Sequence, residues 1–299
     1  MSTGRVPFTV IGGYLGSGKT TLLNHILRNN PGERIALLVN DFGTINIDAE
    51  LIERQEGNTI GLADGCICCS LAAGFFVALE TVLQQDPLPD RVIVEASGVA
   101  DPGKIARYGE SPSFALDGVI VVVDVETVQA RAGDKYVGRT VTRQLASADL
   151  LVLNKIDLIT PERKREVAAW LARVAPQSRL IEARFGSVPP AFLFGLDGDR
   201  TLSTLAANGD DHDHDAGYTT WTHVSPAPTT REAFEEYVRQ LPHTVIRGKG
   251  FVYLAAQPDR QQIFQLVGPR WTLKPGALWQ AEQRMTRIVF IAATPTSLD

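Results

Sequence analysis

The stretch Phe8-Thr9-Val10-Ile11-Gly12-Gly13-Tyr14-Leu15-Gly16-Ser17-Gly18-Lys19-Thr20 decides the fold of this chain. Its last eight residues satisfy the pattern Gly-x-x-x-x-Gly-Lys-Ser/Thr, an apolar run precedes them, and a helical pattern follows over Thr20–Arg28. Glycines let the backbone curl so that several N–H groups converge on phosphate oxygens, and the helix adds its positive N-terminal end. A strand, a phosphate-binding loop and a helix in this order predict a P-loop nucleotide hydrolase.

Each polar side chain of this loop has a chemical task. Lys19 is expected to neutralise charge on the β- and γ-phosphates, and the Thr20 hydroxyl to bind Mg²⁺. The other residues expected to contact the nucleotide here are Gly13, Gly16, Ser17, Gly18 and Thr21. The structural alternative is a glycine-rich turn without a ligand.

Short β-branched runs alternate with helical patterns over the first two thirds of the chain. The predicted strands are Phe8–Ile11, Ile35–Val39, Arg91–Val94, Val119–Val123, Leu150–Leu153 and Arg179–Ile181, and the predicted helices include Thr20–Arg28, Leu71–Leu83 and Pro161–Val174. Continuous apolar strands separated by helices indicate a parallel sheet with both faces covered. We therefore expect an α/β domain with a doubly wound, mostly parallel sheet.

The sequence predicts two domains and a linker. Residues 1–200 form the predicted nucleotide-binding domain, residues 201–218 an acidic linker that contains histidines, and residues 219–299 a smaller α+β domain. The strands predicted in the last part are Thr219–Val224, Phe251–Ala255, Gln262–Val267 and Arg287–Ala292, with a Thr-capped helix over Arg231–Gln240.

A second motif, Asn154-Lys155-Ile156-Asp157, directly follows the predicted strand Leu150–Leu153. A carboxylate such as that of Asp157 can accept hydrogen bonds from both N1–H and the exocyclic N2–H of guanine, whereas adenine lacks this donor pair. Alone the motif is weak, because turns at strand ends often contain Asn and Asp. Together with the phosphate loop it predicts GTP as the nucleotide.

Two further segments are suited to sense the nucleotide state. Glu95 ends a buried strand, where it can hold Mg²⁺ or its water, and the backbone N–H of Gly98 can meet the γ-phosphate. The polar segment Asn40–Asp48 also follows a strand and is a candidate first switch, with Asp41 and Asp48 as its acids. Plain strand-end turns or surface loops are the alternatives.

Composition excludes several classes of function. The net charge of −5 provides no overall attraction to nucleic acid or to an anionic membrane. No apolar run approaches the roughly 20 residues that a spanning helix needs, and the N-terminus leaves no room for a signal peptide. We expect a cytoplasmic protein with neither nucleic acid nor membrane as a partner.

All three cysteines of the chain lie within one short segment, Cys66-Ile67-Cys68-Cys69. Thiolates bind Zn²⁺ and other soft or borderline cations, and three of them supply most of a tetrahedral site. Redox sensing and simple burial are the alternatives. A second candidate is the pair His212 and His214 within an acidic segment, for which a solvated loop without metal is the alternative.

Taken in chain order, these motifs resemble the CobW family of metal-chaperone GTPases, which is related to UreG and HypB. The motifs are the phosphate loop, Asn40-Asp41-Phe42-Gly43, Gly65-Cys66-Ile67-Cys68-Cys69, the Glu95–Pro102 segment and Asn154–Asp157. The resemblance covers nearly the whole chain and implies GTP hydrolysis coupled to delivery of Zn²⁺ or Co²⁺ to a client metalloprotein. Members usually carry acids where this chain has Asp41 and Thr44, so the second acid is absent here.

The resemblance leaves two other functions open. One is a GTP-dependent activator of a metalloenzyme that supplies no metal ligand, and the other is a metal store in which the nucleotide only stabilises the fold. A homodimer is left open as the assembly, and no residue is identified as a general base.

Overall fold

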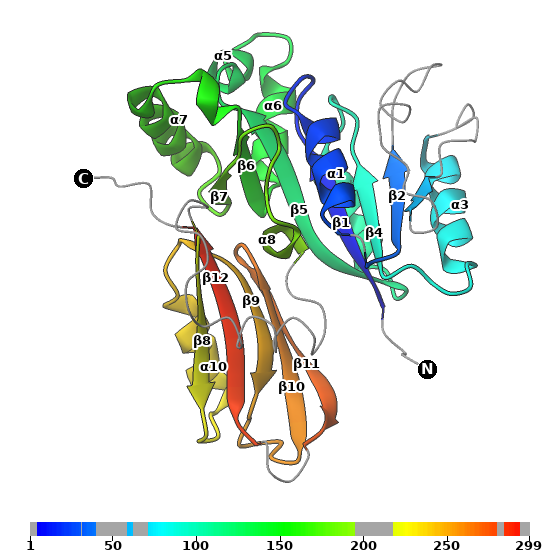
Figure 1. The fold of residues 1–299 in the computed structure, drawn as a ribbon, viewed down its shortest axis with the longest axis vertical. Coiled ribbons are helices and arrows are strands. Elements are labelled where there is room, and N and C mark those ends of the chain that lie inside the picture. Colours follow the sequence, from blue (N-terminus) through cyan, green and yellow to red (C-terminus); the bar gives the residue numbers. More distant parts are fainter. Residues whose placement is uncertain are drawn as a thin grey trace. The chain divides into compact units, whose positions relative to one another are not determined.

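The computed structural model describes residues 5–30, 32–39, 59–61, 71–194, 218–279 and 284–293 (Figure 1). The chain divides into two compact units. The first takes in the chain up to Pro190 apart from residues 177–181, and the second takes in those five residues and everything from Ala191 onward.

A seven-stranded sheet organises the nucleotide-binding part, in the order β3-β2-β4-β1-β5-β6-β7. The strands are β1 (Val6–Gly12), β2 (Ile35–Val39), β3 (Thr59–Gly61), β4 (Arg91–Glu95), β5 (Phe114–Asp124), β6 (Leu150–Asn154) and β7 (Arg179–Glu182). The strands from β3 to β6 pair in parallel. Because β1 lies between β4 and β5, the strand order reverses beside it, and the carboxyl ends of these strands frame a ligand-binding crevice in open α/β sheets.

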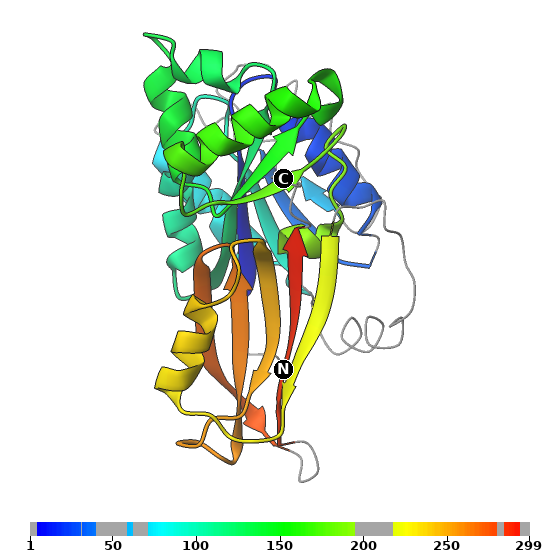
Figure 2. The same cartoon turned by 90° about the vertical axis from the view of Figure 1, so that its left-hand side faces the viewer.

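Helices lie on both faces of this sheet (Figures 1 and 2), so the predicted doubly wound α/β fold is confirmed. The helices of the first unit are α1 (Lys19–Arg28), α3 (Leu71–Leu83), α4 (Pro102–Ala106), α5 (Val128–Ala132), α6 (Gly138–Ala146) and α7 (Pro161–Val174), with the 3₁₀ turns η1 (Arg107–Glu110) and η2 (Ile156–Leu158). The short helix α8 (Pro190–Phe194) follows β7 in the chain and lies almost wholly in the second unit. The sequence did not predict α4, α5, α6 or α8. Three of these have five residues, which is too short to show a helical period.

The central strands are apolar because both of their faces are buried. Residues 119–123 are each at most 2% exposed, as expected for a strand covered on two sides. β5 starts five residues earlier than the sequence predicted. Phe114 extends the strand by pairing with Val6, and its ring packs against that of Phe8 with 5.4 Å between centroids.

The second unit is built on a five-stranded antiparallel sheet in the order β11-β10-β9-β12-β8. Its strands are β8 (Tyr218–Ser225), β9 (Val245–Val252), β10 (Arg260–Val267), β11 (Arg270–Leu278) and β12 (Thr286–Ala293). Helix α10 (Arg231–Arg239) is capped by the Thr230 hydroxyl, which accepts a hydrogen bond from the N–H of Ala233 at 3.1 Å. The predicted α+β architecture is confirmed.

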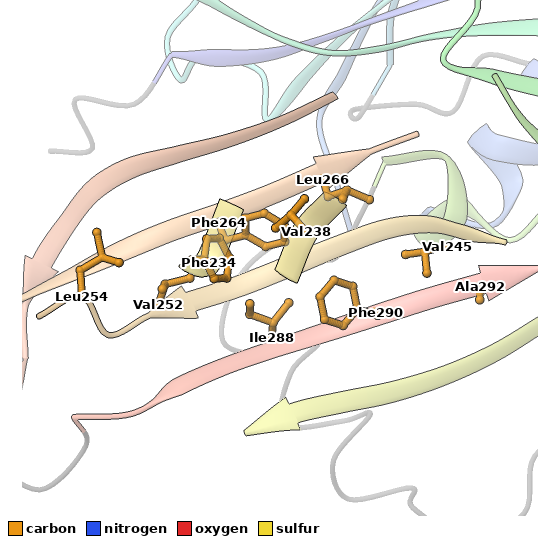
Figure 3. Close-up of a cluster of buried hydrophobic side chains, with 10 residues drawn as sticks. All are labelled: Phe234, Val238, Val245, Val252, Leu254, Phe264, Leu266, Ile288, Phe290 and Ala292. Carbon is orange, nitrogen blue, oxygen red and sulfur yellow. The ribbon is translucent and has the colours of Figure 1, made fainter. Parts of the chain in front are cut away.

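An apolar core joins α10 to this sheet (Figure 3). Phe234 of α10 packs edge-on against Phe264 of β10, with centroids 5.1 Å apart, and Phe290 of β12 completes the cluster. Both sheet rings are fully buried. The second unit thus has a hydrophobic core of its own.

Two strand predictions in this unit were wrong. The predicted strand Phe251–Ala255 shares only Phe251 and Val252 with β9, which runs from Val245 to Val252, and β11 was not predicted. Glycine weakens a strand pattern, yet a Cβ on Gly250 would lie 2.0 Å from the Arg287 carbonyl oxygen, so only glycine fits beside β12. β11 contains Pro275, which an edge strand tolerates because one side of its backbone lacks a partner strand.

One buried charge stabilises the first sheet at the beginning of β4. Arg91 is 1% exposed, and its Nη1 lies 2.9 Å from Asp117 Oδ2 and its Nε 3.4 Å from Glu33 Oε2. Asn30 donates to the same Glu33 oxygen at 2.6 Å. This network ties β4 to β5 and to the segment that precedes β2.

We predict that Arg91→Ala lowers the free energy of unfolding by about 2–4 kcal/mol, because it leaves two largely buried carboxylates without their cation. Denaturant titration followed by circular dichroism measures the change. The matched control is Arg165→Ala, whose ion pair with Glu162 is exposed and should cost less than about 1 kcal/mol. Equal losses in both variants would contradict a stabilising role for the Arg91 network.

Candidate nucleotide-binding site

The predicted phosphate loop lies between β1 and α1, at the carboxyl edge of the first sheet. Gly13, Gly16 and Gly18 have φ values of 139°, 77° and 101°, in the region that favours glycine. The loop is closed by a hydrogen bond from the Ser17 N–H to the Tyr14 carbonyl at 3.1 Å. This backbone conformation turns the chain tightly into the N-terminus of α1.

At two of these positions a side chain would also clash with neighbouring atoms, so glycine is required there. A Cβ on Gly13 would lie 2.4 Å from the Val122 carbonyl oxygen of β5, and one on Gly18 would lie 2.3 Å from Asn154 Nδ2. Either side chain would displace a fixed neighbour. The loop is therefore a cradle of backbone pressed against the ends of β5 and β6.

The side chains of this cradle suit a phosphate and its counterion. Lys19 is 8% exposed and Thr20 is half-buried at the first turn of α1. The Ser17 hydroxyl oxygen is buried and has no hydrogen-bond partner among the described residues. A backbone cradle, a buried ammonium and an unsatisfied hydroxyl fit a triphosphate group with Mg²⁺.

Asn154 joins the second motif to the phosphate loop. Its side chain is 2% exposed; its Nδ2 donates to the Ser17 carbonyl at 3.0 Å, and its Oδ1 accepts from the Gly186 N–H at 2.9 Å. The end of β6 is thereby fixed both to the phosphate loop and to the turn after β7. Asn154 ties these loops together, while its predicted contact with the nucleotide remains a prediction.

The rest of the motif is presented toward solvent. Lys155 has φ 65°, and its Nζ lies 2.7 Å from Asp124 Oδ2 at the end of β5. Asp157 follows in η2 and is exposed, so its carboxylate is accessible to a ligand. We call this side of the phosphate loop, next to Asn154, the base end.

The turn after β4 lies against the other side of the loop. Glu95 is the last residue of β4, as predicted, and its side chain is 2% exposed. A Cβ on Gly98 would lie 2.4 Å from Leu15 Cδ2 and 3.0 Å from the Leu15 nitrogen, so the turn touches the phosphate loop directly. We call this side, next to Gly98, the γ end.

Sequence reasoning missed three residues that hold these loops. Gln144 of α6 is 2% exposed and donates from Nε2 to the carbonyls of Gly98 and Ala100, at 3.1 and 2.8 Å. Gly186 contacts both Asn154 and the start of α1, and Asp124 holds Lys155. Of the three, Asp124 had a sequence signal, because it is an acid directly after the apolar run Val119–Val123.

Several predicted site residues lie outside the described residues. They are the candidate first switch Asn40–Asp48, the thiolates Cys66, Cys68 and Cys69, and the histidines His212 and His214. Within the described ranges no group of three or more His, Cys, Asp or Glu is placed to hold a metal ion. The helices of these ranges also include none with the length and apolar character needed to cross a membrane.

Comparison with known proteins agrees with this geometry. Residues 7–182 match the family model for the CobW/HypB/UreG nucleotide-binding domain, and residues 218–298 match that for the cobalamin synthesis protein CobW C-terminal domain. A protein from Sinorhizobium sp named zinc chaperone CobW is 32% identical, over 96% of this chain and 93% of its own length. The zinc chaperone YjiA of Escherichia coli is 26% identical, over 96% of this chain and 93% of its own.

The fold is shared with a solved structure. A Zn(II)-bound triple mutant of the YjiA GTPase superposes with a TM-score of 0.50 at 22% identity, covering 98% of this chain and 96% of that one. The resemblance inferred from the motifs is thus confirmed at the level of sequence and of fold. The chain belongs to the CobW/HypB/UreG family of nucleotide-binding proteins.

Proposed function

We propose that this protein hydrolyses GTP and uses the nucleotide state to bind a transition metal, Zn²⁺ or Co²⁺, and deliver it to a client metalloprotein. The observation that carries the nucleotide part is the Asn154 amide, which joins the phosphate loop and the guanine-type motif into one site. Relatives named zinc chaperones, at 32% identity over nearly the whole chain, support the metal part.

The described residues divide the work of hydrolysis between them. Lys19 would neutralise phosphate charge, and the N–H groups of the phosphate loop and of α1 would bind the phosphate oxygens. Thr20 and Glu95 would hold Mg²⁺, which when bound offsets negative charge on the β- and γ-oxygens. Asp157 would accept hydrogen bonds from guanine at the base end.

The three thiolates would form the metal site, and their place in the chain suggests how it is controlled. Cys66, Cys68 and Cys69 lie between the candidate first switch and the Glu95 strand. Segments that order around GTP would draw the thiolates together, and hydrolysis would release them, so that a client takes the ion. The pair His212 and His214 is a weaker set of ligands for the same ion.

A related named protein favours one alternative. The zinc-regulated GTPase metalloprotein activator 1 of Dictyostelium discoideum is 27% identical over 93% of this chain. A protein that only activates its client needs no metal ligand of its own, whereas a chaperone that delivers the metal must bind it. Stoichiometric metal binding that depends on the three cysteines would indicate the chaperone, and its absence would indicate the activator. A metal store would bind the ion without turning over GTP.

We predict that Asp157→Asn weakens binding of GTP and makes xanthosine triphosphate the better ligand, because the new amide presents a donor where guanine also presents one. Competition against a fluorescent guanine nucleotide measures the affinities for GTP, XTP and ATP. Asp134→Asn is the matched control, since Asp134 is an exposed acid whose carboxylate accepts hydrogen bonds from the N–H groups of Tyr136 and Val137 in its own turn. Unchanged selectivity in Asp157→Asn would reduce the motif to a strand-end turn.

We also predict that the metal binds more tightly with a non-hydrolysable GTP analogue than with GDP, and that Cys66/Cys68/Cys69→Ser abolishes this binding. Coupling is reciprocal, so a tenfold effect of nucleotide on metal affinity requires a tenfold effect of metal on nucleotide affinity, about 1.4 kcal/mol. Zn²⁺ and Co²⁺ are titrated against a competing chelator in both nucleotide states. Affinity should fall as the pH is lowered, because thiols must deprotonate to bind.

Two results would contradict this model of the metal site. Equal metal affinity with GDP and with the GTP analogue would show that the nucleotide state does not control metal binding. Tight binding of one ion by the triple serine variant would remove the thiolates as ligands and make His212 and His214 the leading ones. Absence of GTP turnover in the wild type would favour the metal store.

A further inference from the structure

We infer that Arg131 of α5 is a catalytic residue of GTP hydrolysis, an arginine supplied in cis that contacts the γ-phosphate as it leaves. Its guanidinium carbon lies 5.6 Å from the centroid of the Tyr14 ring, and Tyr14 belongs to the phosphate loop. This inference rests on the proposed GTP hydrolysis and adds a residue for which the motifs gave no signal.

The position of Arg131 follows from the two ends of the site. Gly18 and Ser17 face Asn154 at the base end, whereas Leu15 touches Gly98, whose N–H we expect to meet the γ-phosphate. Tyr14 directly precedes Leu15, so the guanidinium over the Tyr14 ring lies beside the residue of the phosphate loop that comes just before the one in contact with Gly98. Figures 1 and 2 both show α5 at the end of the unit where the loop between β1 and α1 lies.

The surroundings leave this guanidinium available. One small, mostly apolar hollow beside the loop is lined by residues that include Tyr14, Ser17 and Gln144. Among its described lining residues Arg131 is the one cation and Asp124, which is paired with Lys155, the one acid. Arg131 is exposed, and it forms no ion pair within the described ranges. A cation–π contact at an exposed position is weak, so the guanidinium can turn from the ring to a phosphate oxygen.

The backbone of Arg131 is well fixed. Its N–H donates to the Thr127 carbonyl at 2.9 Å, and the Thr127 N–H donates to the Asp124 carbonyl at 3.3 Å. Asp124 in turn forms an ion pair with Lys155, and Val128, the first residue of α5, is buried. The helix that carries Arg131 is therefore anchored to β5 and β6, which also anchor the phosphate loop.

Hydrolysis of GTP is accelerated by a positive charge close to the γ-phosphate. In hydrolysis a water oxygen forms a bond to the γ-phosphorus while the bond from that phosphorus to the β–γ bridging oxygen breaks. The electron pair stays on the bridging oxygen, which becomes a terminal oxygen of GDP, and the water proton passes to phosphate. The triphosphate carries more negative charge than Lys19 and one Mg²⁺ neutralise, and a planar guanidinium offers paired donors to two oxygens without losing its own proton.

The test compares Arg131→Ala with Arg131→Lys, and with Arg139→Ala as the matched control. Arg139 is an exposed arginine on the neighbouring helix α6. We expect Arg131→Ala to lower kcat at least about 100-fold, with an intermediate rate for Arg131→Lys and a wild-type rate for Arg139→Ala. Affinities for GDP and for a non-hydrolysable GTP analogue, and the melting temperature, should stay close to those of the wild type.

Two further measurements test the role of the guanidinium: binding of a transition-state mimic, and rescue of the variant by free guanidinium. Arg131→Ala should lose the tight binding of GDP with aluminium fluoride, which mimics the transferring phosphoryl group, and free guanidinium should restore part of its rate. A rate within threefold of wild type, or an equal loss in Arg139→Ala, would overturn the inference while leaving the proposed function in place. Wild-type protein that binds but does not hydrolyse GTP would overturn both.

Discussion

The side-chain amide of Asn154 is the interaction on which the arrangement of the first unit's site depends. It connects the Ser17 carbonyl with the Gly186 N–H, and so joins loops that follow β1, β6 and β7. The amide is buried, and a buried group left without its partner costs on the order of 1–3 kcal/mol. Gly18 is part of the same constraint, because any side chain there would occupy the space of the amide.

This constraint separates the site into two ends with different chemistry. At the base end the strands β5 and β6 finish in Asp124 and Asn154, and the ion pair of Lys155 with Asp124 fixes the segment that presents Asp157. At the γ end, Gly98 rests on Leu15. Both ends are attached to the carboxyl edge of one sheet, which keeps their spacing constant.

The turn at the γ end is hydrogen-bonded to helix α6. Gln144 donates to two carbonyls of this turn from within the protein, so a change at Gly98 has to move or break those bonds. Buried hydrogen bonds of this kind have discrete arrangements, and that property suits a switch between nucleotide states. Under the proposed function, a change of nucleotide state at Gly98 would reach α6 through these two hydrogen bonds.

The sequence by itself determined the elements whose signals are local. The glycines and Lys19 of the phosphate loop follow a strand and open a helix, and the apolar runs of β1, β4, β5 and β6 are long enough to read as buried strands. The Thr cap of α10 was equally readable, because the capping oxygen of Thr230 and its N–H partner in Ala233 lie three residues apart. The α+β class of the second unit also followed from its strand and helix patterns, whereas the antiparallel pairing and the strands β9 and β11 came only from the structure.

Only the tertiary structure decided which distant residues meet at the site. Gln144 lies 46 positions from Gly98, Gly186 lies 32 from Asn154, and Asn154 lies 137 from Ser17. Nothing in a local pattern marks such pairs, because their contacts come from the order of the strands in the sheet. The same holds for Arg131 over Tyr14, and for Gly250, whose place in β9 is dictated by the approach of β12. The residue types set the chemistry, and the parallel packing of β1 between β4 and β5 brought those residues to one edge.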